Sequence, residues 1–338
     1  MSVPLIGFAL TLAFFYLSMH LYTAQFRALM PDTVESGKRG TASGVITLLE
    51  WAGNLFLFGL AGYLIAKAVD MTGGESEGIK ALTQTPYLKI PFLVTAFFLI
   101  GAAVFVYLIV REPEAPDIEE NESLGEYLWS IVRNRDFLKF YAAQTLWWMS
   151  FEFIAVFLYG ILAFILYGSA TEENIKAVTS LGLYLMALFN VAVLLGALPG
   201  GIIYDKLGRR LSIVLGGLIF AIPQLWGGWF ITTKAQITIA LGIAGIGWGG
   251  ILMAASYPVI GDLLTKFERE AFTGRYYGFF EATRSLPVLL AGTIGGGAIV
   301  DLAGENYRVL FPIGALLVLL ALPMVWMMKN LDVEGGKE

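Results

Sequence analysis

The sequence predicts an all-α, polytopic membrane protein. Apolar residues make up 57% of the 338-residue chain and charged residues only 14%, a composition outside the range of ordinary soluble domains. Continuously apolar runs of about 20 residues, the length that lets a helix cross a bilayer, recur along the whole chain. The runs do not alternate in polarity as the strands of a membrane barrel do, so helices are preferred.

Nine spanning helices are expected from these runs. The first lacks the basic start and small-residue cleavage site of a secretory signal, so we expect it to be retained. The predicted spans cover roughly residues 3–22, 42–66, 90–110, 137–166, 175–203, 211–231, 237–263, 276–300 and 309–328.

A charged segment separates the third run from the fourth. Residues 112–134 contain Pro113, Pro116 and an acidic run, which indicates a solvated linker. Leu124, Leu128 and Ile131 then recur at helical spacing, which predicts an amphipathic helix that lies on the inner leaflet or packs under the bundle. The expected organisation is a partial N-terminal bundle of three helices at 1–111, this linker at 112–134, and a C-terminal six-helix bundle at 135–338.

One short polar stretch lies between the fifth and sixth runs, with the sequence GGIIYDKLGRR at 200–210. The glycines at its start let helices approach closely, and Gly208 permits a positive φ in a tight reversal. Its basic residues hold this membrane edge on the cytoplasmic side.

The distribution of Lys and Arg gives the orientation. With the 200–210 stretch inside, fifteen Lys and Arg residues fall at inside positions and six at outside ones. This imbalance follows the positive-inside rule. The C-terminus is therefore expected to be cytoplasmic, in a multi-pass protein of the plasma membrane.

An internal repeat relates the two parts of the chain. RALMPD at 27–32 and RGTASG at 39–44 lead into a glycine-containing apolar helix, as do YPVIGD at 257–262 and TGRYYG at 273–278. Six spans separate equivalent positions, so the repeat unit is a parallel six-helix unit.

The GxxxDKxGRR pattern at 201–210 resembles the loop signature of major facilitator superfamily transporters. The links at 27–44 look like the fourth-to-fifth helix link of the sucrose/proton and glycoside/cation symporter branch, and the aromatic run at 147–153 is compatible with that branch. The resemblance implies a major facilitator fold in which the nine helices are equivalent to helices 4–12 of a 6+6 bundle. The first three helices and the first copy of the signature are then absent from this chain.

The resemblance implies a secondary active transporter that moves a small polar solute, such as a sugar or glycoside, by alternating access coupled to a proton or sodium gradient. The alternative is a non-transporting membrane protein, a sensor or a fragment that needs a partner to complete its first half. The family also implies that Asp205 touches the start of the span that opens near Gly40 and closes the cytoplasmic side. The expected conformational latch comprises Gly201, Asp205, Lys206, Gly208, Arg209, Arg210, Arg27, Asp32 and Arg39.

Ionisable residues inside spans are costly and are candidates for coupling or solute contact. Glu152 lies mid-span among aromatic residues and is the first choice for a proton-binding carboxylate, although a structural hydrogen-bonded carboxylate is the alternative. Glu281 and Arg284 are three residues apart and share a helix face, either as a switching pair or as a structural one. Glu50, in the second span, is the fourth candidate for proton or cation coupling.

A solute cavity needs aromatic faces and amide or hydroxyl groups. Several such residues lie near helix centres, although an aromatic belt at the membrane interface explains any single tryptophan equally well. The candidates for the substrate cavity are Trp147, Trp148, Gln144, Asn190 and Asn54.

Covalent chemistry has few groups to use here. The chain has no cysteine and one histidine, and it contains no recognisable nucleophile, phosphate-loop or metal motif. We expect no cofactor, no metal, no nucleic-acid partner and no enzymatic activity. The expected partners are the lipid bilayer and a small solute with a proton or sodium ion.

Overall fold

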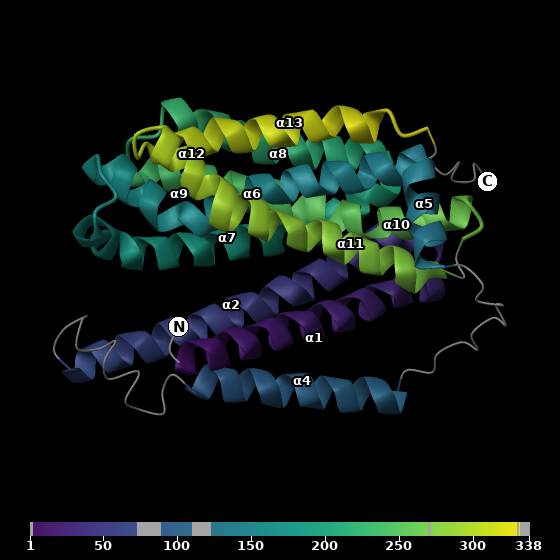
Figure 1. The fold of residues 1–338 in the computed structure, drawn as a ribbon, viewed down its shortest axis with the longest axis horizontal. Helices are drawn as coiled ribbons and strands as arrows, with labels where there is room; N and C mark the ends of the chain where they lie inside the picture. Colours follow the sequence, from purple (N-terminus) through teal and green to yellow (C-terminus); the bar gives the residue numbers. More distant parts are fainter. Residues whose placement is uncertain (1–2, 73–88, 110–122, 270–271, 330, 332–338) are drawn as a thin grey trace. The chain divides into compact units, whose positions relative to one another are not determined.

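The computed structural model describes residues 3–72, 89–109, 123–269, 272–329 and 331. All regular structure in these residues is helical, which confirms the predicted all-α class (Figure 1). In chain order the elements are α1 Val3–Thr33, η1 Ser36–Lys38, α2 Arg39–Thr72, α4 Lys89–Ile109, α5 Leu124–Arg133, α6 Arg135–Tyr167, α7 Glu172–Leu207, α8 Arg209–Trp229, α9 Lys234–Gly245, η3 Ile246–Met253, α10 Ala254–Lys266, α11 Thr273–Pro287, η5 Val288–Gly295, α12 Gly296–Leu302, η6 Tyr307–Val309 and α13 Leu310–Trp326.

Eight helices of the described residues are long and apolar enough to cross a membrane. They cover Ser36–Leu64, Lys89–Ile109, Arg135–Tyr167, Glu172–Leu207, Arg209–Trp229, Lys234–Lys266, Thr273–Leu302 and Tyr307–Trp326. Each of them overlaps one predicted span. The remaining predicted span, at 3–22, is the first in the chain and falls within α1, which continues to Thr33.

The chain forms two compact units by its internal contacts. One contains residues 1–49 and 121–338, and the other contains residues 50–120. In the smaller unit, Phe56 of α2 and Phe98 of α4 pack edge to face with ring centroids 6.3 Å apart. The predicted boundary after residue 111 falls outside the described residues, so the three-part organisation stays a prediction.

Side-chain caps and glycines set the helix ends of the larger unit. Ser123 and Glu126 form a reciprocal capping box at the start of α5, and the Asn134 side chain accepts hydrogen bonds from the first backbone N–H groups of α6. Gly208 alone separates α7 from α8, with φ at 88°. The positive φ expected at this glycine is therefore present, and the signature up to Leu207 is helical.

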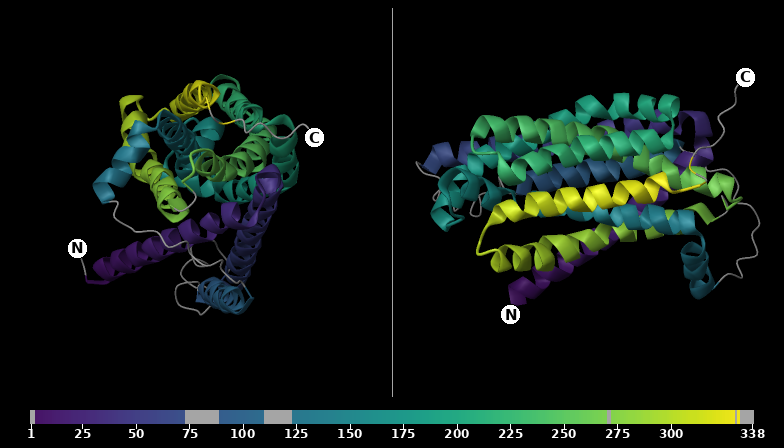
Figure 2. Two further views of the ribbon diagram at one scale, coloured as in Figure 1. Left: turned by 90° about the vertical axis from the view of Figure 1, so that its right-hand side faces the viewer. Right: turned by 90° about the horizontal axis from the view of Figure 1, so that it is seen from above.

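The six spans from α6 to α13 lie side by side (Figure 2), and glycines form several of the close contacts between them. A Cβ on Gly200 would collide with the carbonyl oxygen of Gly250, and one on Gly196 would lie 2.8 Å from the Gly250 Cα. Gly250 belongs to η3, a π-helical segment within the seventh predicted span. The glycines of η3 thus allow tight packing of α7 against this segment.

The repeat is visible in the contacts between its two copies. The Arg27 guanidinium lies 4.0 Å from the ring centroid of Tyr257, the residue at the equivalent repeat position. Pro31 would similarly be 2.9 Å from a Cβ on its equivalent, Gly261. Contacts between equivalent residues are expected where α1 and α10 cross on a two-fold axis.

One end of the larger unit gathers most of the basic residues. The end of α1, the start of α2, helix α5, the α7–α8 junction and the α10–α11 link all meet there (Figure 1). We call it the Asp205 end. The α6–α7, α8–α9 and α12–α13 links lie at the opposite end (Figure 1).

Candidate functional site

Asp205 caps the start of α2. Its Oδ1 accepts a hydrogen bond from the Gly40 backbone N–H at 2.9 Å, and its Oδ2 accepts from the Thr41 N–H at 2.7 Å and the Thr41 hydroxyl at 2.6 Å. The first N–H groups of a helix have no partner inside the helix and attract negative charge. The carboxylate therefore satisfies both groups, and this is the contact that the sequence predicts.

Gly201 makes the close approach possible. A Cβ on Gly201 would collide with the Gly40 carbonyl oxygen, and a Cβ on Gly40 would lie 2.6 Å from the Asp205 Oδ1. Any side chain at either position would push α7 away from α2. The two glycines thus hold Asp205 within hydrogen-bonding reach of α2.

Asp262 forms the centre of a second cluster, which the sequence analysis missed. Its Oδ1 accepts from Arg39 at 3.0 Å, and its Oδ2 accepts from the Arg209 Nε at 2.7 Å and the Tyr204 hydroxyl at 2.6 Å. The side chain of Asp262 is 1% exposed, so the carboxylate depends on these partners for its charge. Arg209 also donates to the Ser36 hydroxyl at 3.0 Å.

Asp262 therefore joins three segments of the Asp205 end: the α1–α2 link, the α7–α8 junction and α10. Its repeat position, equivalent to Asp32, was the only signal that could have identified it. Of the other latch candidates, Asp32 and Lys206 are exposed and Arg210 is half-buried.

Arg27 belongs to a third group, deeper in the unit. Its guanidinium forms a buried ion pair with Glu281 of α11 and donates to the Tyr257 hydroxyl at 3.1 Å. Arg284, one turn along α11, lies 3.8 Å from the second Glu281 oxygen. The expected pairing of Glu281 with Arg284 is present, but Arg27 of α1 shares the same carboxylate.

Arg284 extends this group to α6. Its guanidinium lies 4.4 Å from the Trp148 ring centroid and interacts electrostatically with Glu152. We call the series Arg27, Glu281, Arg284 and Glu152 the ion-pair series. Its two ion pairs are Arg27–Glu281 and Glu281–Arg284, and the four side chains come from α1, α11 and α6.

An aromatic cluster adjoins the ion-pair series. Trp148 packs edge to face on Trp248 at 4.9 Å, and Phe151 stacks on Trp248 at 4.6 Å. Of the residues expected to line the substrate cavity, Trp148 contacts the ion-pair series through the Arg284 guanidinium. The cluster gives this region an apolar wall beside an alternating set of charges.

The other cavity candidates have packing contacts. Gln144 donates to the Phe280 carbonyl at 3.0 Å, the Asn190 amide donates to the Met186 carbonyl at 2.7 Å, and Trp147 is fully buried beside Phe140. Their role in a solute cavity stays a prediction. Glu50 and Asn54 belong to the smaller unit, so the site described here does not include them.

Two features of this site are suited to a conformational cycle. The Asp205 and Asp262 contacts tie the α1–α2 link to the α7–α8 junction, and they are composed of reversible hydrogen bonds. The ion-pair series offers alternative partners, because Glu281 lies within ion-pair distance of both Arg27 and Arg284. None of these groups has the arrangement of a nucleophile with its base.

A family model described as Major Facilitator Superfamily matches residues 152–337, which is more than half of the chain. The chain belongs to the major facilitator superfamily. The match covers the ion-pair series from Glu152 onward as well as the 200–210 signature. This member of the superfamily is thus a polytopic protein of a solute-transporter family.

Two curated relatives come from Bacillus subtilis (strain 168). The chain is 32% identical over 146 residues to "Multidrug transporter protein MdtP", an alignment that covers 41% of this chain and 25% of that protein. It is 31% identical over 121 residues to "Uncharacterized MFS-type transporter YttB", covering 36% and 28%. The matched part therefore spans about a quarter of the length of these relatives.

Proposed function

We propose that this superfamily member is a secondary active transporter that moves a small polar solute by alternating access, driven by a proton or sodium gradient. The resemblance of the 27–44 links to sugar symporters favours a sugar or glycoside as the solute. One relative is named as a multidrug transporter, which supports including amphipathic cations among the solutes tested.

The observation that carries the proposal is the pair of carboxylate contacts at the Asp205 end. Asp205 contacts the α2 start and Asp262 lies between Arg39 and Arg209, and in this proposal these contacts would hold the end closed. Alternating access requires contacts that close one side and are released when the other side closes. We assign the Asp205 end to the cytoplasmic side of the plasma membrane, because the basic residues gather there; the C-terminus then lies on the same side.

The ion-pair series would couple the gradient to this motion. Glu152 would bind and release the coupling proton, and its occupancy would decide whether Arg284 pairs with Glu152 or with Glu281. Since Glu281 also pairs with Arg27 of α1, a change at Glu152 would reach the helix that leads into the closed end. In this proposal the exchange of ion-pair partners within the series couples proton binding to the motion of α1.

The test is solute flux in proteoliposomes that contain the full-length protein. Labelled sugars, glycosides and amphipathic cations would be offered with an imposed proton gradient, with a sodium gradient and with neither. We expect gradient-driven net uptake by wild type, and for Glu152→Gln we expect loss of net uptake with retained solute exchange. A wild type without any gradient-dependent flux would support the non-transporting alternative, and an unaffected Glu152→Gln would exclude Glu152 as the coupling carboxylate.

A further inference from the structure

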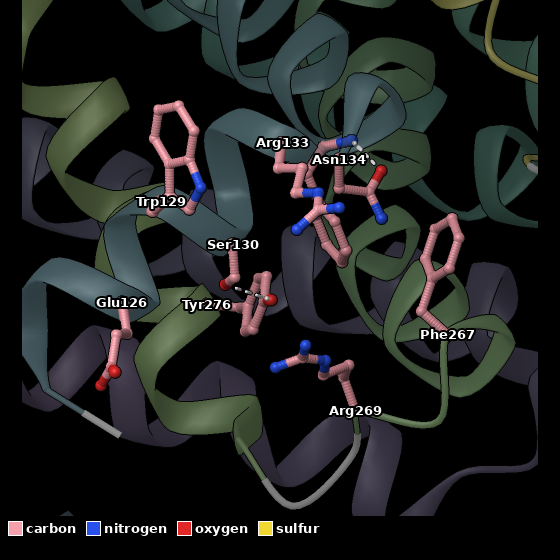
Figure 3. Close-up of a pocket in the computed structure, with 9 residues that line it drawn as sticks. Glu126, Trp129, Ser130, Arg133, Asn134, Phe267, Arg269 and Tyr276 are labelled. Carbon is pink, nitrogen blue, oxygen red and sulfur yellow. Dashed lines mark hydrogen bonds between the residues drawn. The ribbon is translucent and has the colours of Figure 1, made fainter.

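A pocket of about 520 Å³ lies under α5 at the Asp205 end, and its lining residues are separate from those of the site described above. Its walls come from α5, the start of α6, the residues after α10 and the start of α11 (Figure 3). Its volume is within the range of small-ligand sites, roughly 300–1,000 Å³. The lining residues are Glu126, Trp129, Ser130, Arg133, Asn134, Phe137, Phe267, Arg269 and Tyr276.

Two guanidinium groups converge on this pocket from separate elements. Arg133 comes from the last turn of α5 and Arg269 from the α10–α11 link, and both side chains extend toward the space beside Tyr276 (Figure 3). Arg269 also lies 5.8 Å from the Phe272 ring centroid. Planar guanidinium groups bind the oxygens of phosphate through paired, charge-assisted hydrogen bonds.

The carboxylate of the pocket is committed elsewhere. Glu126 accepts a hydrogen bond from the Ser123 backbone N–H at 2.7 Å, and its side chain points away from both arginines (Figure 3). The hydrogen bonds with Ser123 also hold the pKa of Glu126 below its usual value. Arg133 and Arg269 thus extend into the inner part of the pocket, whereas the Glu126 carboxylate faces away from it (Figure 3).

The floor of the pocket is aromatic and rigid. The Phe137 ring packs 4.6 Å from Tyr276 and 5.8 Å from Phe267, and the Tyr276 hydroxyl lies 3.3 Å from the Ser130 hydroxyl. The Ser130 hydroxyl donates to the Tyr127 carbonyl at 2.7 Å, so the two guanidinium groups would supply the hydrogen bonds to a phosphate group resting on this floor.

The outer side of α5 is apolar and exposed. Leu128 is 39% exposed, Trp129 65% and Val132 49%, whereas Tyr127 and Ile131 on the opposite side are buried. Tryptophan concentrates at the level of lipid headgroups, and an amphipathic helix with such a face lies at the membrane surface. One side of α5 therefore packs on the bundle, and the other side is exposed and available to lipid. The two positions expected for this helix, under the bundle and on the inner leaflet, are compatible with each other.

We propose that the pocket under α5 binds a phosphate group, carried by a phospholipid headgroup or by a soluble phosphate ester. In the lipid case the headgroup phosphate lies between Arg133 and Arg269, and the acyl chains follow the exposed face with Trp129. The bound group connects α5 to the α10–α11 link. This site does not depend on which solute the protein moves.

The test is a binding titration on the purified full-length protein in detergent. The probes are dihexanoyl phosphatidylglycerol, glycerol 3-phosphate and, as a phosphate-free control, dihexanoylglycerol. We expect the phospholipid to bind and dihexanoylglycerol not to bind. We also expect R133Q and R269Q each to weaken phospholipid binding by about tenfold, the effect of losing one charge-assisted hydrogen bond.

Arg308→Gln, at the opposite end of the unit, is the matched control and should bind as wild type does. If glycerol 3-phosphate competes with the phospholipid, the site recognises the phosphate group itself. If the phospholipid binds and glycerol 3-phosphate does not compete, the ligand is the lipid. Binding of neither phosphate probe would overturn the proposal, as would binding that R133Q and R269Q leave unchanged. R133Q replaces an exposed side chain, so this variant keeps the test valid if R269Q fails to fold.

Discussion

Replacing Asp205 with asparagine should open the Asp205 end. Asparagine has nearly the same shape as aspartate, but it carries no charge and presents only one acceptor oxygen. The other terminal group becomes an NH₂ donor, which would face backbone N–H groups at the start of α2. The variant therefore retains the side-chain volume and loses the charged cap.

The magnitude follows from the contacts. Asp205 accepts three hydrogen bonds, from the Gly40 N–H, the Thr41 N–H and the Thr41 hydroxyl. Hydrogen bonds to a charged group contribute about 1.5–3 kcal/mol each, and a charge at a helix N-terminus about 0.3–1 kcal/mol. Asparagine keeps one acceptor oxygen and therefore part of these hydrogen bonds, so we expect a net loss of about 2 kcal/mol, or about 30-fold in the ratio of closed to open molecules.

The chain has no cysteine, so spin labels can be placed at two chosen positions. Cysteines at Lys38 and Lys266, both exposed at the Asp205 end, would report the separation of the α1–α2 link from α10. Double electron–electron resonance should show a longer-distance population that grows in Asp205→Asn. Asp301→Asn, at the opposite end, should leave the distribution unchanged. Identical distributions for wild type and Asp205→Asn would refute the latch.

The remaining predictions concern the other contacts. Arg39→Gln leaves the buried Asp262 with one cation fewer and should lower the free energy of unfolding by about 3–5 kcal/mol, measured as a lower melting temperature in detergent. Adding Asp262→Asn to this variant should recover part of the lost stability. A double variant whose loss equals the sum of the two single losses would contradict the pairing. Gly201→Ala forces a Cβ onto a backbone oxygen of α2 and should destabilise by about 1–3 kcal/mol; Gly274→Ala, with open space around it, is its control, and equal melting of the two would contradict the close approach. The Ser123 hydrogen bonds lower the pKa of Glu126, so the capping box of α5 should be complete at neutral pH and lost as the pH falls through that lowered pKa. Amide hydrogen exchange of α5 would detect this loss. An unchanged protection of α5 across that pH range would contradict the prediction.

Hydropathy and periodicity predicted most of the fold. Each of the eight spans follows from a run of apolar residues, because lipid requires helices whose backbone groups are satisfied internally. The break at Gly208 was also predictable, because a glycine leaves a local signature, whereas the contact of Asp205 with the helix start at Gly40 was implied only by the family resemblance. The amphipathic pattern predicted that α5 is a helix but not its two faces, because Leu128 lies on the exposed side and Ile131 on the buried one.

Contacts between distant segments were harder to predict. Asp262 forms ion pairs with Arg209 and Arg39, which are 53 and 223 residues away in the sequence. A local sequence pattern does not predict contacts between residues this far apart. Arg27 likewise pairs with Glu281, 254 residues away, rather than with the loop signature to which it was assigned. The burial of Trp147 has the same origin, since a tryptophan mid-span can face either a cavity or its neighbouring helices.

The central claim is gradient-driven transport, and steady-state accumulation tests it most directly. Proteoliposomes would receive a labelled solute from the panel at equal concentration on both sides, and a proton or sodium gradient would then be imposed. We expect the internal concentration to rise above the external one and to return to equality when an ionophore collapses the gradient. An internal concentration that never departs from the external one, for every solute and with either gradient, would contradict the proposal.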